Sequence, residues 1–218
     1  MRFSCRMLIA LTLCALGWDV VAGPATSGVP ADTARLLVAA HAQVGRTVLY
    51  DPSYQRLAFP GGDVPLYRGV CADVVVRALR GVGVDLQREV NLDMRAHFAA
   101  YPQLWGVRDP DPNIDHRRVP NLETWFRRHG MALPVSAQAR DYKPGDIVSW
   151  RLQRGQPHIG IVSERHSADG LRPLVIHNIG YGTQEQDVLF DWQISGHFRY
   201  FGGSSAQRQG WPGRRADS

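Results

Sequence analysis

Apolar residues recur at helical spacing in two stretches of the first half of the chain. Leucines and alanines three and four positions apart predict a first helix, which Asp32 or Thr33 would cap and Gly45 would end. A second apolar run, over 71–80, contains no proline or glycine and predicts another helix. Residues 47–69 between them are rich in Pro, Gly and Tyr, which indicates a long structured loop.

The pattern changes from helical to strand-like after about residue 140. In the middle of the chain, helical spacing predicts short helices at about 91–100 and 120–129, the second capped by Asn121. Short alternating or apolar runs bounded by Pro and Gly then predict strands at 146–150, 158–163, 173–180 and 197–201. Helices followed by an antiparallel sheet indicate an α+β domain.

The first 22 residues predict a cleavable secretory signal. Arg2 and Arg6 precede an apolar stretch, and small residues follow it. The stretch is shorter than the roughly 20 residues that a membrane span needs, so no stable membrane insertion is expected. We therefore expect a periplasmic or secreted protein with one domain over 31–201, followed by a disordered basic tail over 202–218.

The charge of the chain limits the classes of partner. The formal net charge is +5, and removal of Arg2, Arg6 and Asp19 with the signal leaves +4. This mild excess suits an anionic surface such as a cell wall. The basic residues are scattered and lack interleaved aromatic residues, so no nucleic-acid partner is expected, and the domain is expected to be a monomer.

Cys71 is the one cysteine that the expected mature chain keeps, because Cys5 and Cys14 lie in the signal. A disulfide is therefore excluded, and the thiol is either a buried, inert side chain or a functional one. Gly69 precedes it, and the predicted helix follows it. At a helix N-terminus the dipole favours a thiolate, so we expect a nucleophile with a lowered pKa.

Two histidines are candidates for the base that such a nucleophile needs. His158 begins the HIGIVS strand, and His177 lies near the end of PLVIHNIG. A turn-like segment separates the two strands, which predicts antiparallel neighbours whose side chains meet at about 5 Å. His158 would take the thiol proton, and His177, or its neighbour Asn178, would orient the imidazole.

Other polar residues have a structural and a functional interpretation. Asp73 would cap the Cys71 helix, or would bind a substrate amine or a nearby arginine. His116 and Arg117 would form an ion-pair network, or would bind the carboxylates of an acidic peptide. A metal site formed by the two strand histidines with Asp187, Asp191 and His197 has no close ligand spacing in its favour, so no metal or cofactor is expected.

Five segments in order carry a resemblance to a known superfamily: AHAQVGRTVLY, GVCADVV, KPGDIVSW, HIGIVS and VIHN. They resemble the motif series of NlpC-type cell-wall peptidases, which are papain-like, with a helix-borne cysteine packed on a small antiparallel sheet. The resemblance implies Cys71 as nucleophile, His158 as base and His177 as the third polar group, with Tyr50 nearby.

The sequence also departs from that pattern. Val70 and Ala72 flank the cysteine where aspartate and serine are usual, and residues from about 85 to 140 form an insertion. Over roughly 35–201 the chain is similar to a family of exported bacterial domains of unknown function.

The resemblance implies an exported cysteine hydrolase that cleaves peptide or amide bonds, with peptidoglycan stem peptides as the expected substrate. The Cys71 backbone N–H and Tyr50 would stabilise the oxyanion. Three alternatives stay open: an inactive cell-wall-binding module of the same fold, a metal-dependent hydrolase that uses the histidines, and chemistry on another acyl group such as a lipid ester.

Overall fold

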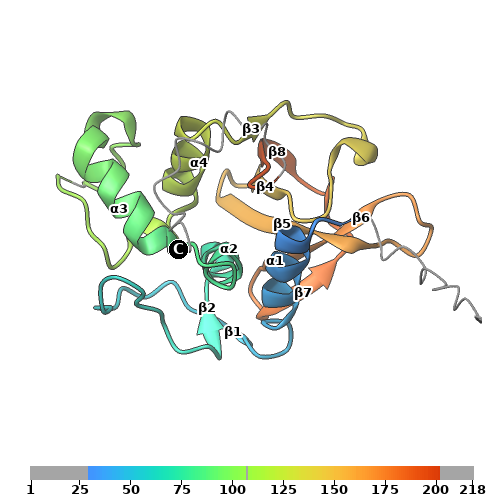
Figure 1. The fold of residues 1–218 in the computed structure, drawn as a ribbon, viewed down its shortest axis with the longest axis horizontal. Coiled ribbons are helices and arrows are strands. Elements are labelled where there is room, and N and C mark those ends of the chain that lie inside the picture. Colours follow the sequence, from blue (N-terminus) through green and yellow to red (C-terminus); the bar gives the residue numbers. More distant parts are fainter. Residues whose placement is uncertain (1–28, 107, 202–218) are drawn as a thin grey trace, which may run out of the picture.

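The computed structural model describes residues 29–106 and 108–201 of the chain (Figure 1). The predicted signal over 1–22, with Cys5 and Cys14, and the predicted tail over 202–218 lie outside the described residues. No helix among the described residues is both long and apolar enough to cross a membrane. The described part combines helices with a small antiparallel sheet, so the α+β prediction is confirmed.

The helices belong mostly to the first two thirds of the chain. They are α1 (Ala31–His41), α2 (Cys71–Arg80), α3 (Leu86–His97) and α4 (Val119–Arg128), with single 3-10 turns η1 (Phe98–Ala100), η2 (Asp115–Arg117) and η3 (Ala139–Asp141). The predicted helix over 71–80 is confirmed. The predicted caps were wrong: α1 begins after Pro30, and Asn121 lies inside α4, where its amide donates to the Asp115 carbonyl.

The main sheet has six antiparallel strands in the order β3-β8-β4-β5-β6-β7. Their bounds are β3 (Ala132–Leu133), β4 (Ile147–Arg151), β5 (Pro157–His166), β6 (Pro173–Asn178), β7 (Thr183–Gln186) and β8 (Gln193–Phe198). A separate parallel pair joins β1 (Leu49–Tyr50) to β2 (Arg68–Gly69), within the loop predicted over 47–69. The edge strands β3 and β7 were not predicted.

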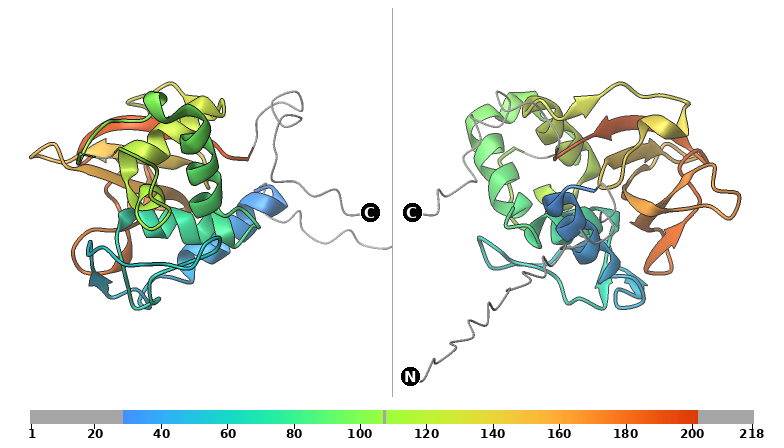
Figure 2. Two further views of the ribbon diagram at one scale, coloured as in Figure 1. Left: turned by 90° about the vertical axis from the view of Figure 1, so that its left-hand side faces the viewer. Right: turned by 45° about the vertical axis from the view of Figure 1, so that its right-hand side comes forward.

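Alternation along the strands separates two apolar clusters. Ile159, Ile161 and Ile176 face the helices and pack with α2 and α4, whereas Trp150 and Val162 belong to a second cluster on the opposite face of the sheet. Helix α2 packs between α1, α3 and strands β5 and β6. Figure 2 shows the helices gathered on one side of the molecule and the orange and red strands on the other.

Candidate active site

Cys71 is the first residue of α2, and its helix N-terminus is held in place by Asp73. One Asp73 carboxylate oxygen accepts the Val70 N–H at 2.7 Å, as a capping residue does. Gly69 is required just before this turn, because a Cβ there would lie 2.9 Å from an Asp73 oxygen. The capping prediction for Asp73 is therefore confirmed. This turn sets the position of the Cys71 backbone at the start of α2.

The Cys71 side chain is free of disulfides and buried, with 3% of its surface exposed. Burial raises the pKa of the thiol to about 11, although the N–H groups of Ile159 and Ala72 and the Tyr50 hydroxyl act in the opposite direction. The expected lowered pKa was wrong, because the loss of water outweighs the helix N-terminus and these donors. The resting site thus holds a neutral thiol.

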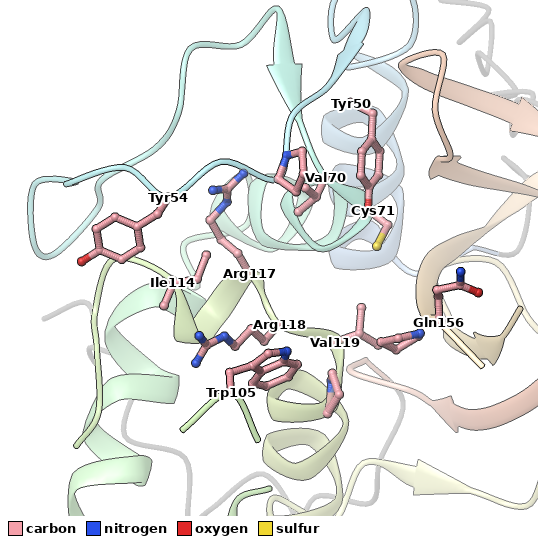
Figure 3. A pocket seen from close by; sticks show the side chains of 13 residues that line it. Tyr50, Tyr54, Val70, Cys71, Trp105, Ile114, Arg117, Arg118, Val119 and Gln156 are labelled. Carbon is pink, nitrogen blue, oxygen red and sulfur yellow. The ribbon is translucent and has the colours of Figure 1, made fainter. Parts of the chain in front are cut away.

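Tyr50, at the end of β1, points toward the thiol (Figure 3). Its hydroxyl is hydrogen-bonded to Cys71, and its pKa is raised, first by burial and then by the neighbouring sulfur. A tyrosine with a raised pKa stays protonated at neutral pH and remains a hydrogen-bond donor. The structure therefore brings Tyr50 and Cys71 together from the loop and the helix.

The two strand histidines contact each other directly. Strands β5 and β6 are antiparallel with Gly160 opposite His177, and His158 Nε2 lies 2.8 Å from His177 Nδ1. The predicted neighbour relation is confirmed. Gly160 permits it, because a Cβ there would lie 3.0 Å from the His177 Cβ. His177 Nε2 lies in turn 2.9 Å from Gln186 Oε1 on β7.

The imidazole pair is enclosed by aromatic rings. His158 lies 5.7 Å from Trp150 and 5.6 Å from Trp192 between ring centroids, and both histidines are at most 2% exposed. Burial lowers the pKa of His158 to about 3, with a smaller contribution from His177, and burial lowers that of His177 to about 4. Both rings are therefore neutral at pH 7.

The thiol reaches the backbone at the start of β5, next to the position of His158 in the chain. The Ile159 N–H is hydrogen-bonded to the Cys71 sulfur, so the sulfur lies against the peptide group that directly follows His158. The His158–His177 bond uses Nε2, so Nδ1 is the ring nitrogen of His158 that His177 does not engage. The side chains approach from different sides, because Ile159 faces the helices and His158 packs with Trp150.

Asp73 and Arg117 form a buried ion pair beside the thiol. Arg117 Nε and Nη2 donate to the two Asp73 oxygens at 2.9 and 3.0 Å, and its remaining donors reach the Ser53 and Asp51 carbonyls. The two side chains are 4% and 2% exposed. Four of the five Arg117 N–H groups are engaged in this way, and the pair ties the loop before β2 to α2.

Two further predicted candidates lie in the interior. His116 is buried in η2, where burial lowers its pKa to about 4, and it does not line the groove beside Cys71. Asn178 donates to the Gly69 carbonyl at 3.1 Å, so it braces the turn before Cys71. His177, and not Asn178, is the residue bonded to His158.

A groove of about 520 Å³ opens beside the thiol. Its walls come from the loop before β2, from the starts of α2 and β5, and from the region between α3 and α4 (Figure 3). Across the groove from Tyr50, Arg118 stacks on Trp105 with its guanidinium carbon 4.4 Å from the ring centroid. Trp105 has a left-handed backbone conformation, with φ of 60°, which is rare for a bulky residue.

Sequence reasoning missed one residue of this arrangement, Gln186, and gave no specific role to Trp105. Trp105 lies in a connection without a helix or strand, and Gln186 lies on a polar strand that carries no apolar signal. The local hint was the Arg117-Arg118 pair: both residues line the groove, but Arg117 is paired with Asp73 and Arg118 stacks on Trp105.

The proposed metal ligands do not converge. Among residues 29–106 and 108–201, no group of three His, Cys, Asp or Glu side chains is placed to hold a metal ion. His197 instead bonds to Asp146 at 2.7 Å, and Asp187 pairs with Arg172 at 2.7 Å. The metal-dependent alternative is therefore without a ligand set in the described chain.

Comparison with known proteins places the described domain in a family. The family described as "Domain of unknown function (DUF1287)" matches residues 37–200. The chain is 60% identical to "Uncharacterized protein YijF" of Escherichia coli (strain K12) over 162 residues, which cover 74% of this chain and 78% of that protein. No solved structure matches the chain. The matched range contains the thiol, the imidazole pair and the groove residues.

Proposed function

The chain belongs to the DUF1287 family, and we propose that it is an exported, papain-like cysteine hydrolase of the NlpC type that cleaves peptide or amide bonds in peptidoglycan stem peptides. One observation carries the proposal. A free thiol at a helix N-terminus lines a groove and lies against the peptide group that follows His158, whose ring is paired to a second imidazole.

The proposed reaction uses the thiol and imidazole groups at this point. Cys71 Sγ attacks the substrate carbonyl carbon and gives its proton to His158 Nδ1. That proton then passes to the nitrogen of the breaking C–N bond, and the amine leaves. Water attacks the resulting thioester, His158 takes one of its protons, and the thiol is restored as the acid departs. His177 holds the His158 ring throughout.

The neutral resting state shapes the first step. Burial alone disfavours a lone thiolate and a lone imidazolium at this site. The two charges therefore arise together, by proton transfer as the substrate replaces water in the groove and the sulfur turns from the Ile159 amide toward the imidazole. The Tyr50 hydroxyl and the Cys71 N–H are the donors that would receive the oxyanion.

The shape of the groove supports an extended peptide as substrate. Tyr50, Tyr54 and Trp105 supply apolar surface along it, and Arg118 supplies a cation whose Nη1 bonds to Asp115 at 3.2 Å. A guanidinium suits a carboxylate group, and stem peptides carry several. Arg118 thus has the carboxylate-binding role in this proposal, whereas the Arg117 guanidinium is engaged by Asp73.

The test is digestion of purified muropeptides by the mature protein, with the products identified by mass spectrometry. We expect one new amine and one new carboxyl terminus per cleavage, turnover abolished in Cys71→Ala, and inhibition by iodoacetamide but not by a chelator. Circular dichroism of Cys71→Ala checks that the fold is retained. Full activity in Cys71→Ala would refute the proposal, and tight muropeptide binding without cleavage would favour the binding-module alternative.

A further inference from the structure

We propose that Gln186 is a positioning residue, which sets the tautomers of His177 and His158 so that His158 Nδ1 presents a lone pair. Gln186 is the last residue of β7, at the edge of the sheet, and pairs with Val175 in the β6–β7 register. Its amide oxygen reaches His177 Nε2 at 2.9 Å. The role toward Cys71 rests on the proposed function, whereas the tautomer assignment does not.

The tautomers follow one from the next along this chain of contacts. A carboxamide oxygen only accepts hydrogen bonds, so His177 Nε2 must carry the hydrogen. Nδ1 of a neutral His177 is then bare and accepts, which places the hydrogen of His158 on Nε2. The remaining nitrogen, His158 Nδ1, is left without a hydrogen and is able to take a proton.

The opposite arrangement would disable the base. If the amide group of Gln186 were turned by half a circle, its NH₂ would donate to His177 Nε2, and every donor and acceptor along the chain would reverse. His158 Nδ1 would then carry a hydrogen and could not receive another. The orientation of the Gln186 amide therefore decides whether His158 Nδ1 can accept a proton or already carries a hydrogen.

Gln186 acts here without a competing charge. The interactions that shift the two imidazoles, besides burial, are their contact with each other and the Gln186 bond, and no carboxylate or guanidinium among the described residues takes part. Trp150 and Trp192 cover the pair with apolar ring surface. Because the two rings are at most 2% exposed, the partly exposed Gln186 amide is the neutral acceptor that fixes their hydrogen positions.

Two variants and one matched control separate this role from packing. Gln186→Leu keeps a similar volume and removes the acceptor, whereas Gln186→Glu keeps an acceptor that cannot donate. Gln184→Leu is the control, because Gln184 lies on the same strand, directly opposite His177 in the register. It shares the face of His177, and no hydrogen bond links it to either imidazole.

The primary readout is the tautomer state, from nitrogen-15 NMR of the mature protein at pH 7. We expect hydrogens on Nε2 of both rings in the wild type, in Gln186→Glu and in Gln184→Leu, and mixed tautomers in Gln186→Leu. The second readout is the rate of Cys71 alkylation by iodoacetamide, which we expect to fall about three- to tenfold in Gln186→Leu, as for loss of one neutral hydrogen bond.

The outcomes distinguish this inference from the proposed function. A hydrogen on Nδ1 of His177 in the wild type, or unchanged tautomers in Gln186→Leu, would overturn the assignment. Changed tautomers with an unchanged alkylation rate would overturn the link to Cys71. If the expected tautomers were found in a protein that cleaves no muropeptide, the tautomer assignment would be supported. Only the proposed hydrolase function would then be contradicted.

Discussion

The two walls of the groove are built in different ways. On the wall formed by the starts of α2 and β5, Cys71 is buried and Asp73 is bonded to Arg117 and backbone, while the histidines, bonded in series on β5 and β6, do not line the groove. On the wall formed between α3 and α4, Trp105 is 55% exposed, has a left-handed backbone and holds Arg118 only by stacking. The first wall carries the residues of the proposed chemistry, and the second carries those of the proposed ligand contact.

Arg117 and Arg118 show the difference most directly, because they are adjacent in the chain. Arg117 is the last residue of η2 and turns inward to the Asp73 carboxylate, where it has a structural role. Arg118 follows it and lies over Trp105 at the groove, bonded to Asp115 by one nitrogen. Two identical side chains that both line the groove therefore have different partners, a buried carboxylate for Arg117 and an exposed indole ring for Arg118.

The largest expected effect comes from removing the proposed base, His158, beside the first wall. We expect His158→Asn to lower kcat/KM on a cleaved muropeptide by about 10²- to 10⁴-fold, the usual contribution of general acid–base catalysis. Because the asparagine cannot take the thiol proton, the loss should appear in kcat. Steady-state kinetics measure it, and a kcat within threefold of the wild type would remove His158 from the mechanism.

The next effect concerns the stability of the same wall. Replacing Asp73 by Asn leaves the Arg117 guanidinium buried without its counter-charge, which should cost about 3–5 kcal/mol in the free energy of unfolding. The matched control is Asp32→Asn, whose exposed pair with Arg35 should contribute less than about 1 kcal/mol. Urea denaturation compares the two, and equal losses would contradict the structural role of the buried pair.

The buried histidines predict a loss of stability in mild acid. The pKa values of His116, His158 and His177 are lowered to about 4, 3 and 4 by burial, whereas unfolded histidines titrate near 6.5. Below about pH 6.5 the unfolded state binds more protons, so the free energy of unfolding should fall as pH falls toward 4. The slope is at most about 1.4 kcal/mol per pH unit for each histidine.

Denaturant titrations at pH 7, 6 and 5 measure that slope. His116→Asn should make it shallower, because one buried neutral imidazole has been removed. A free energy of unfolding that stays constant from pH 7 to pH 5 would show that these rings are not held neutral by the fold.

The smallest effects are expected on the second wall. Arg118→Met and Trp105→Gly should each raise KM about three- to tenfold, as for the loss of one cation–π or ion contact, and should leave kcat nearly unchanged. Trp105→Gly also removes a side chain from a left-handed position, so it should not destabilise the backbone there. The control is Arg140→Met in η3, outside the groove lining, which should change neither kcat nor KM. A fall in kcat in Arg118→Met or Trp105→Gly, in place of a rise in KM, would make the two walls equivalent.

The local pattern of the sequence determined the elements that carry the candidate site. The apolar run that begins at Cys71 specifies its own helix, because helical spacing and the absence of Pro and Gly act within a few residues. The neighbouring strands of His158 and His177 follow from two apolar runs joined by a short turn, since such runs pair as antiparallel neighbours. The resemblance then assigned these residues roles that await the experiments above.

Only the tertiary structure decided the environment of these residues. Asp73 and Arg117 are 44 positions apart, and Gln186 lies on an edge strand whose polar sequence gives no apolar signal, so no local pattern could pair them with their partners. The pKa of Cys71 depends on how much water the packed loop and sheet remove from it, which outweighs its helix position. Sequence thus fixes short-range geometry, while burial and contacts between distant segments determine protonation and access.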